Sequence, residues 1–113
     1  KSEIKNSIIK FSIGDEVEYD LIIEKLFSNG FERVDFVSEP GQFAVRGAII
    51  DIFSYSFNNP FRISLFGDEI DGINIFDPNT QLSTGKLDKV EIYPDIFKLL
   101  KRRIYGKSFD FNA

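Results

Sequence analysis

Between residues 43 and 75, apolar side chains recur at every second position in successive short runs, and this alternation most constrains the fold. A period of two indicates strands that turn one face toward a core and the other toward solvent. The connections are short and are built from Gly47, the Ser- and Asn-rich loop 54–60, and Gly67-Asp68. Short connections join neighbouring strands in antiparallel order, so the sequence predicts an antiparallel sheet. Its strands are residues 43–46, 48–53, 61–66 and 69–75.

A single helix is predicted ahead of this sheet, over residues 18–29. Its apolar side chains recur at helical spacing and form one stripe, which must be buried against another element. Asn29-Gly30 supplies the left-handed backbone conformation at which helices commonly end. The sequence therefore predicts that the helix stops there and packs on one face of the sheet.

The remaining segments complete a small α+β fold. Short strands are predicted at residues 8–13, 31–37 and 89–93, and residues 80–88 are predicted to be a polar loop. The apolar spacing after Pro94 is compatible with a short C-terminal helix. The predicted fold class is α+β, with a mainly antiparallel sheet of five or six short strands and one N-terminal helix packed on it.

Composition narrows the possible functions. The chain has 113 residues, which favours a single domain over residues 1–113. It contains neither Cys nor His, and it therefore lacks a disulfide, a thiol nucleophile and the most common general base. Its net charge of −4 does not favour non-specific attraction to DNA, and no apolar run approaches the ~20 residues of a membrane span. Because it begins at Lys1 and has no Met, we expect a segment of a longer protein.

Arg62 and Phe66 lie on the predicted strand 61–66, on the face opposite to its core-facing positions. They are about 13 Å apart along the strand. An aromatic ring and an arginine on a solvated face are typical of a protein interface, where both residue types are over-represented. The alternative is that Phe66 covers a second small apolar cluster under the loop 54–59, and that Arg62 is merely solvated. The residues alone leave both interpretations open.

Arg46 ends the run 43–46 and is followed by Gly47. A glycine there indicates a bulge or a close backbone approach, which would turn the arginine sideways. The alternative is a structural ion pair with Asp51 or Asp68. Both interpretations can hold together, because an ion-paired arginine is also a rigid one.

Three further segments contain charged residues that could form a site. The acidic residues Asp68, Glu69 and Asp71 have no metal-ligand spacing around them, and a hairpin that exposes its charges is the better interpretation. Gly106-Lys107-Ser108 lacks the glycine that a phosphate-binding loop needs at position 101, so nucleotide binding is not predicted. The basic segment 98–107 is interpreted as a solvated helix face rather than a phosphate contact.

Several motifs along the chain resemble one family. They are Pro40-Gly41, Phe43-Ala44-x-Arg46-Gly47, Asp51-x-Phe53, Pro60-x-Arg62, Phe66-x-Asp68-Glu69-Ile70 and Phe76-Asp77-x-x-x-Gln81-x-Ser83. This set is similar to the UvrB-homology region of bacterial transcription-repair coupling factors (Mfd), in the domain that recruits UvrA. The resemblance covers residues 14–94, and the tail 95–113 matches less well. Arg33-Val34-Asp35 resembles the coupling factor rather than UvrB, which has Arg-Asn-Asp there.

The resemblance implies a non-catalytic adaptor domain that binds UvrA directly and has no cofactor of its own. It places the UvrA-contacting side chains at Arg46, Arg62 and Phe66, with Leu65 replacing the family's usual aromatic before that Phe. It implies that the parent protein uses ATP, translocates on DNA, and displaces RNA polymerase stalled at damage through other domains. It further implies a bacterial cytoplasmic protein that does not bind membranes, and we expect the domain to be a monomer.

Two other functions stay open. One is a DNA-contacting or structural domain of a UvrB-type excision nuclease subunit, against which the negative charge and the sequence Arg33-Val34-Asp35 both count. The other is a structural domain that packs only against its neighbours inside a helicase. Mixing the domain with UvrA and with duplex DNA on a sizing column would separate these functions.

Overall fold

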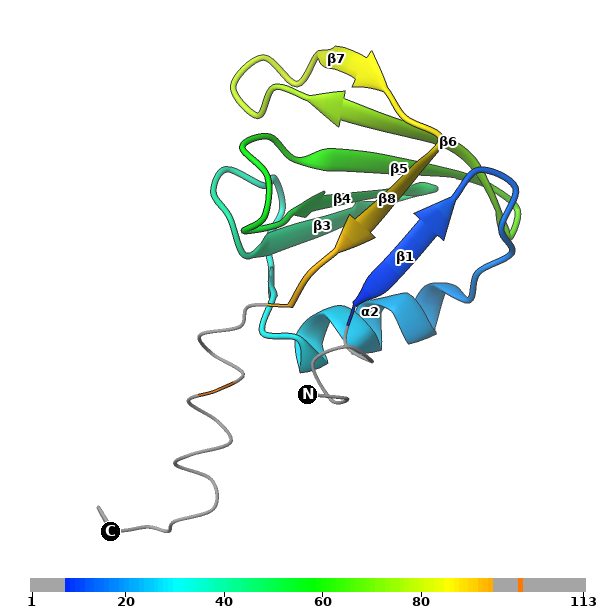
Figure 1. The fold of residues 1–113 in the computed structure, drawn as a ribbon, viewed down its shortest axis with the longest axis horizontal. Coiled ribbons are helices and arrows are strands. Elements are labelled where there is room, and N and C mark those ends of the chain that lie inside the picture. The colour runs from blue at the N-terminus through cyan, green and yellow to red at the C-terminus, as the bar shows by residue number, and fades with distance from the viewer. Residues whose placement is uncertain (1–7, 95–99, 101–113) are drawn as a thin grey trace, which may run out of the picture.

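The computed structural model describes residues 8–94 and Leu100. These residues form a six-stranded sheet, of order β2-β3-β4-β5-β6-β7, together with a helix and a separate two-stranded sheet, β1-β8 (Figure 1). The arrangement confirms the α+β class. The elements are β1 (Ile9–Ser12), α2 (Tyr19–Ser28), β2 (Glu32–Arg33), β3 (Gln42–Arg46), β4 (Ile49–Phe53), β5 (Phe61–Phe66), β6 (Glu69–Phe76), β7 (Ser83–Lys86) and β8 (Lys89–Ile92).

The strands of the large sheet follow one another in space as they do in sequence. Each pair from β3 to β7 is antiparallel, and the short β2 pairs with β3 in parallel. The turns of two hairpins contain Gly47, with φ 59°, and Gly67, with φ 64°. Both values are in the left-handed region that glycine adopts without steric cost. The loop 54–60 joins β4 to β5, and in the register of these two strands Asp51 of β4 lies directly opposite Arg62 of β5.

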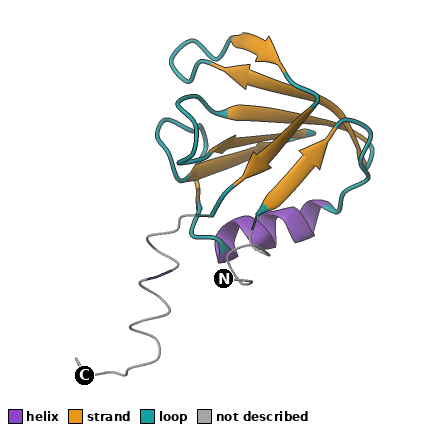
Figure 2. Ribbon diagram, viewed as in Figure 1, coloured by secondary structure: helices purple, strands orange, loops and turns teal. Residues whose placement is uncertain are grey.

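The main apolar core lies on the inner face of the large sheet, which α2 and the small sheet cover (Figure 2). Ile22 and Leu26 of α2 are buried in it, and Gly30, with φ 94°, follows the helix as predicted. The strand residues that enter this core include those that the alternation assigned to it. They are Phe43, Ile50, Ile52, Phe61, Ile63, Leu65, Ile70 and Ile73.

A second, smaller core lies on the outer face of the large sheet. It consists of Val37, Ala44, Phe53 and Phe76, with Val34 packed against it. The segment that follows β2 therefore covers part of the sheet face that the alternation predicts to be exposed to solvent. The predicted strand 31–37 is correspondingly too long, because pairing stops at Arg33 and the chain then bends so that Val37 is buried while Phe36 stays exposed.

The prediction of a loop over residues 80–88 is wrong for half of its length. Ser83–Lys86 forms β7, the edge strand of the sheet, which pairs with β6. An edge strand is stabilised mainly by backbone hydrogen bonds, so its polar side chains give no alternating signal. The last predicted strand is confirmed as β8, with Ile92 fully buried. The predicted helix after Pro94 lies outside the described residues, Leu100 apart.

Candidate functional site

The outer face of the large sheet contains a buried carboxylate, Asp51, bound by two arginines. Its side chain is only 1% exposed. Arg62 donates to it twice, from Nε to Oδ1 at 2.8 Å and from Nη2 to Oδ2 at 2.9 Å. Arg46 donates from Nη2 to Oδ2 at 3.1 Å. A buried carboxylate is tolerated only when it is paired and hydrogen-bonded in this way, so Asp51 fixes the positions of both guanidinium groups.

The guanidinium group of Arg62 contacts three other side chains. Besides its two bonds to Asp51, its Nη2 donates to the side-chain Oε1 of Gln81 at 2.9 Å, and its Nη1 reaches the Gln81 carbonyl at 3.4 Å. The guanidinium lies over the ring of Phe76, 4.2 Å from its centroid. The hydrogen bond to Asp51 raises the pKa of Arg62 above its ordinary value, and the nearby charge of Asp51 adds to the effect. Arg62 is therefore a fixed positive charge.

Gln81 reaches Arg62 because the loop between β6 and β7 is compact. Gln81 itself has φ 66°, in the left-handed region that residues other than glycine seldom adopt. The backbone N–H of Gln81 bonds to the carbonyl of Asp77, and the carboxylate of Asp77 accepts bonds from the next turn of the loop. This closed loop presents both oxygens of Gln81 to the arginine.

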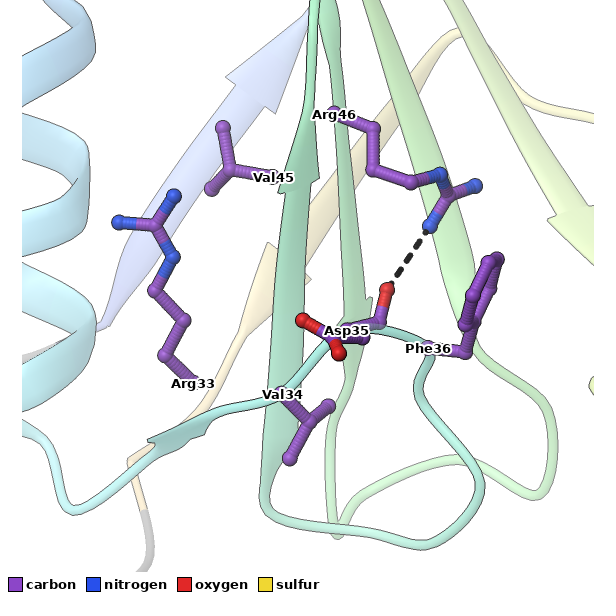
Figure 3. Close-up of a pocket in the computed structure, with 6 residues that line it drawn as sticks. All are labelled: Arg33, Val34, Asp35, Phe36, Val45 and Arg46. Atoms are coloured by element: carbon purple, nitrogen blue, oxygen red, sulfur yellow. Dashed lines mark hydrogen bonds between the residues drawn. The ribbon is translucent and has the colours of Figure 1, made fainter.

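Arg46 lies at the end of β3 and is the more open of the two arginines, with a side chain 34% exposed against 19% for Arg62. Its guanidinium is 4.8 Å from the centroid of the Phe36 ring. Its Nη1 also reaches the Asp35 carbonyl at 3.4 Å (Figure 3). The segment after β2 thus supplies a second set of contacts that aim Arg46 along the outer face.

Phe66 lies at the end of β5 and is 80% exposed. The second core on this face does not include it, which contradicts the alternative that Phe66 covers an apolar cluster. A phenylalanine so exposed buries little apolar surface in the folded chain. Phe66 is therefore available to a partner, on the same face and the same strand as Arg62.

The structure brings the three predicted site residues to one face, but it corrects the description of the arginines. The interpretation of Arg62 as merely solvated is wrong, because its guanidinium is ion-paired and partly buried. For Arg46, the predicted pair with Asp51 is confirmed. The structural role of Gln81 was missed, since a contact made by a loop residue to a strand far along the chain leaves no periodic signal.

Within the described residues, the other charged side chains form no ion pair or side-chain hydrogen bond with Arg46 or Arg62 beyond those given above. Among residues 8–94 and Leu100, no group of three or more acidic, Cys or His side chains is placed to hold a metal ion. The hairpin residues Asp68 and Glu69 are tied by backbone contacts to the segment before α2. Gly106-Lys107-Ser108 and the basic residues of 98–107 lie outside the described residues. No helix in the described part of the chain is long and apolar enough to cross a membrane.

The fold and this site define a small α+β domain whose outer sheet face displays a fixed arginine–carboxylate cluster beside an exposed aromatic ring. Comparison with known families gives a match to the UvrB interaction domain over residues 9–96. The match covers most of the sequence, and this chain belongs to that family.

Individual relatives come from two kinds of protein. The chain is 40% identical over 90 residues to the transcription-repair-coupling factor of Bacillus subtilis, covering 80% of this chain and 8% of the relative. It is 40% identical over 89 residues to UvrABC system protein B of Leptospira biflexa, covering 79% of this chain and 13% of the relative. A coupling factor of Staphylococcus aureus is 39% identical over 88 residues, or 78% of this chain and 7% of the relative. The chain thus spans a small fraction of the length of these proteins.

Proposed function

We propose that this domain is an adaptor that binds UvrA through the outer face of its large sheet, with Arg46, Arg62 and Phe66 as contact residues. The observation that carries the proposal is Phe66, which is 80% exposed at the end of the strand that also holds the fixed positive charge of Arg62. Large aromatic side chains and arginines supply most of the binding energy at protein interfaces. Membership of the UvrB interaction domain family supports the choice of partner.

The binding chemistry follows from the charges on this face. Two guanidinium groups and one carboxylate leave the cluster with a formal charge of +1. The chain as a whole carries −4, so this cluster is a positive group on a negative molecule. Such a group favours a partner surface with acidic side chains and repels partners in the wrong orientation. Phe66 would enter an apolar pocket of UvrA, while the arginines would meet acidic groups around it.

The parent protein is proposed to be a transcription-repair coupling factor of the bacterial cytoplasm. The sequence Arg33-Val34-Asp35 supports it over UvrB, although the identities to the two kinds of relative are equal at 40%. In this proposal, ATP, DNA and RNA polymerase are bound by other domains of the parent. This domain contributes no catalysis, and it recruits nucleotide excision repair to polymerase stalled at DNA damage.

A structural or DNA-contacting domain of a UvrB-type subunit is the second candidate, and the equal identity to the Leptospira biflexa protein favours it. It predicts that the domain binds duplex DNA with an affinity that falls steeply as salt is added. Mixing the 113-residue chain with UvrA and with duplex DNA on a sizing column separates the two candidates, since the adaptor proposal predicts co-elution with UvrA alone.

Replacing Phe66 with Ala should remove the central anchor of the interface. We expect UvrA binding to weaken by about 2 kcal/mol or more, because a desolvated aromatic side chain would be lost from the contact. The matched control is Leu21→Ala, since Leu21 is also an exposed apolar residue, at 49%, but lies on α2 against the inner face of the sheet. Titration of UvrA into each variant measures the effect. Normal UvrA affinity in a folded Phe66→Ala variant would refute the proposed contact.

A further inference from the structure

The two arginines differ in how many N–H donors they have left for a partner. In Arg62 every nitrogen of the guanidinium already donates within the described residues, to Asp51 or to Gln81, and its flat face covers Phe76. Arginine recognises carboxylates best when two parallel N–H groups are free along one edge. Arg62 offers no such edge without breaking its pairing with Asp51.

Arg46 keeps a free donor. Its Nη2 bonds to Asp51 and its Nη1 makes a long contact to the Asp35 carbonyl, while its Nε has no hydrogen-bond partner among the described residues. Its side chain is about twice as exposed as that of Arg62. Arg46 can therefore accept an incoming carboxylate and still keep its bond to the buried Asp51.

An open pocket of about 540 Å³ lies beside Arg46, where β3 continues beyond the short β2 (Figure 3). Arg46 and Phe36 line it together with Arg33, Val34, Asp35 and Val45. Phe36 is 61% exposed, whereas its neighbour Val37 is buried. In Figure 3 the Phe36 ring stands beside the Arg46 guanidinium, and the two side chains form one wall with an apolar part and a charged part.

We propose that this pocket receives an acidic side chain of UvrA, with Arg46 as its ion-pair partner and Phe36 as a second aromatic contact beside it. This inference rests on the proposed function and adds Phe36 to the contact residues. The pocket is lined by two arginines and one aspartate, so its charge suits a single carboxylate. In this arrangement Arg62 acts mainly as a fixed charge on the strand of Phe66, whereas Arg46 makes the direct pairing with the partner.

The test compares Phe36→Ala with Leu21→Ala and Phe66→Ala in the 113-residue chain. Phe36 and Leu21 are both largely exposed, so both variants should melt like the wild type. We expect Phe36→Ala to weaken UvrA binding about tenfold, and Leu21→Ala to change it by less than about twofold. Arg46→Gln should also weaken binding and should make the affinity less sensitive to added NaCl, because the screened ion pair is lost.

The outcomes separate this inference from the proposed function. If Phe66→Ala loses UvrA while Phe36→Ala binds normally, the pocket inference is overturned and the adaptor function stands. If the wild-type chain does not bind UvrA, both are overturned. The UvrA affinity of Arg46→Lys gives a second measurement. It should also fall, since this change keeps the charge but loses the planar guanidinium. Wild-type affinity and wild-type salt dependence in Arg46→Gln would also overturn the inference.

Discussion

Phe61→Ala will unfold at a much lower temperature than the wild type, while Phe66→Ala, a change of the same size on the same strand, will melt almost normally. Phe61 is 4% exposed, belongs to the main core and stacks on Phe57 with ring centroids 5.2 Å apart. Truncating it leaves a cavity and should cost about 3–5 kcal/mol of folding free energy. Phe66 is 80% exposed, and its truncation should cost about 1 kcal/mol or less.

Thermal and urea unfolding of the two variants measure this difference. Phe57 is the internal control, since it is 43% exposed and touches Phe61, so that Phe57→Ala should fall between the two. Equal destabilisation by Phe61→Ala and Phe66→Ala would mean that the two faces of β5 are wrongly assigned. The result also decides whether Phe66→Ala is a clean probe of partner binding, because only a folded variant reports on the interface.

Asp51→Ala should be the most damaging change at the site itself. It removes the only carboxylate that pairs with Arg46 and Arg62 in the described part of the chain, and it leaves Arg62, which is largely buried, without a compensating charge. Breaking such a pair from one side should cost about 3–5 kcal/mol, at the lower end here because Arg62 keeps some contact with solvent. Urea unfolding of the variant gives the cost directly.

The matched control is the double variant Asp51→Leu with Arg62→Leu, which removes both charges of the closest pair. Replacing an ion pair by apolar side chains of similar volume is often nearly neutral, so the double variant should be more stable than the sum of the single changes predicts. A cost below about 1 kcal/mol for Asp51→Ala would contradict the structural role of the pair. UvrA titration of Asp51→Ala should show weaker binding even where the fold survives, since both arginines then lose the carboxylate that positions them.

The pairing also determines which arginine substitutions are informative. Arg62→Glu would place a second carboxylate against the buried Asp51. It should therefore lower the free energy of unfolding as well as the affinity for UvrA. A loss of binding in that variant would not distinguish the interface from the fold. Arg46 is more exposed and its Nε–H has no partner among the described residues, so neutral changes there report more directly on UvrA binding.

Local patterns predicted most of the fold. The alternation in β4 and β5 was enough to assign Phe61, Ile63 and Leu65 to the core, because an antiparallel strand with one buried face has a strict period of two. The helix and its stop at Asn29-Gly30 followed from spacing and from the glycine. The strand over Ser83–Lys86 was missed because its stability comes from backbone pairing with β6, which leaves no trace in the side chains.

The site was predictable in its residues but not in its organisation. Alternation placed Arg62 and Phe66 on the outer face, and the resemblance singled out Arg46. That Asp51 is shared by both arginines depends on the register between three strands, and that Gln81 binds Arg62 depends on the shape of a distant loop. The predicted strand over residues 31–37 gave no indication that Phe36 contacts Arg46, because the chain bends after Arg33 and the period of two ends there.

The cage that Asp51 and Gln81 form around Arg62 has a consequence for the thermodynamics of association. A long arginine side chain normally loses rotamer freedom when a partner immobilises it, at a cost of about 0.5–1.5 kcal/mol. Here the side-chain entropy of Arg62 is lost when the chain folds. Binding of the partner therefore adds little further entropy cost at this residue. Local opening of the loop between β6 and β7 would restore the rotamer freedom of the Arg62 side chain. Mutations in that loop should therefore lower the affinity for UvrA even if they alter no contact with it.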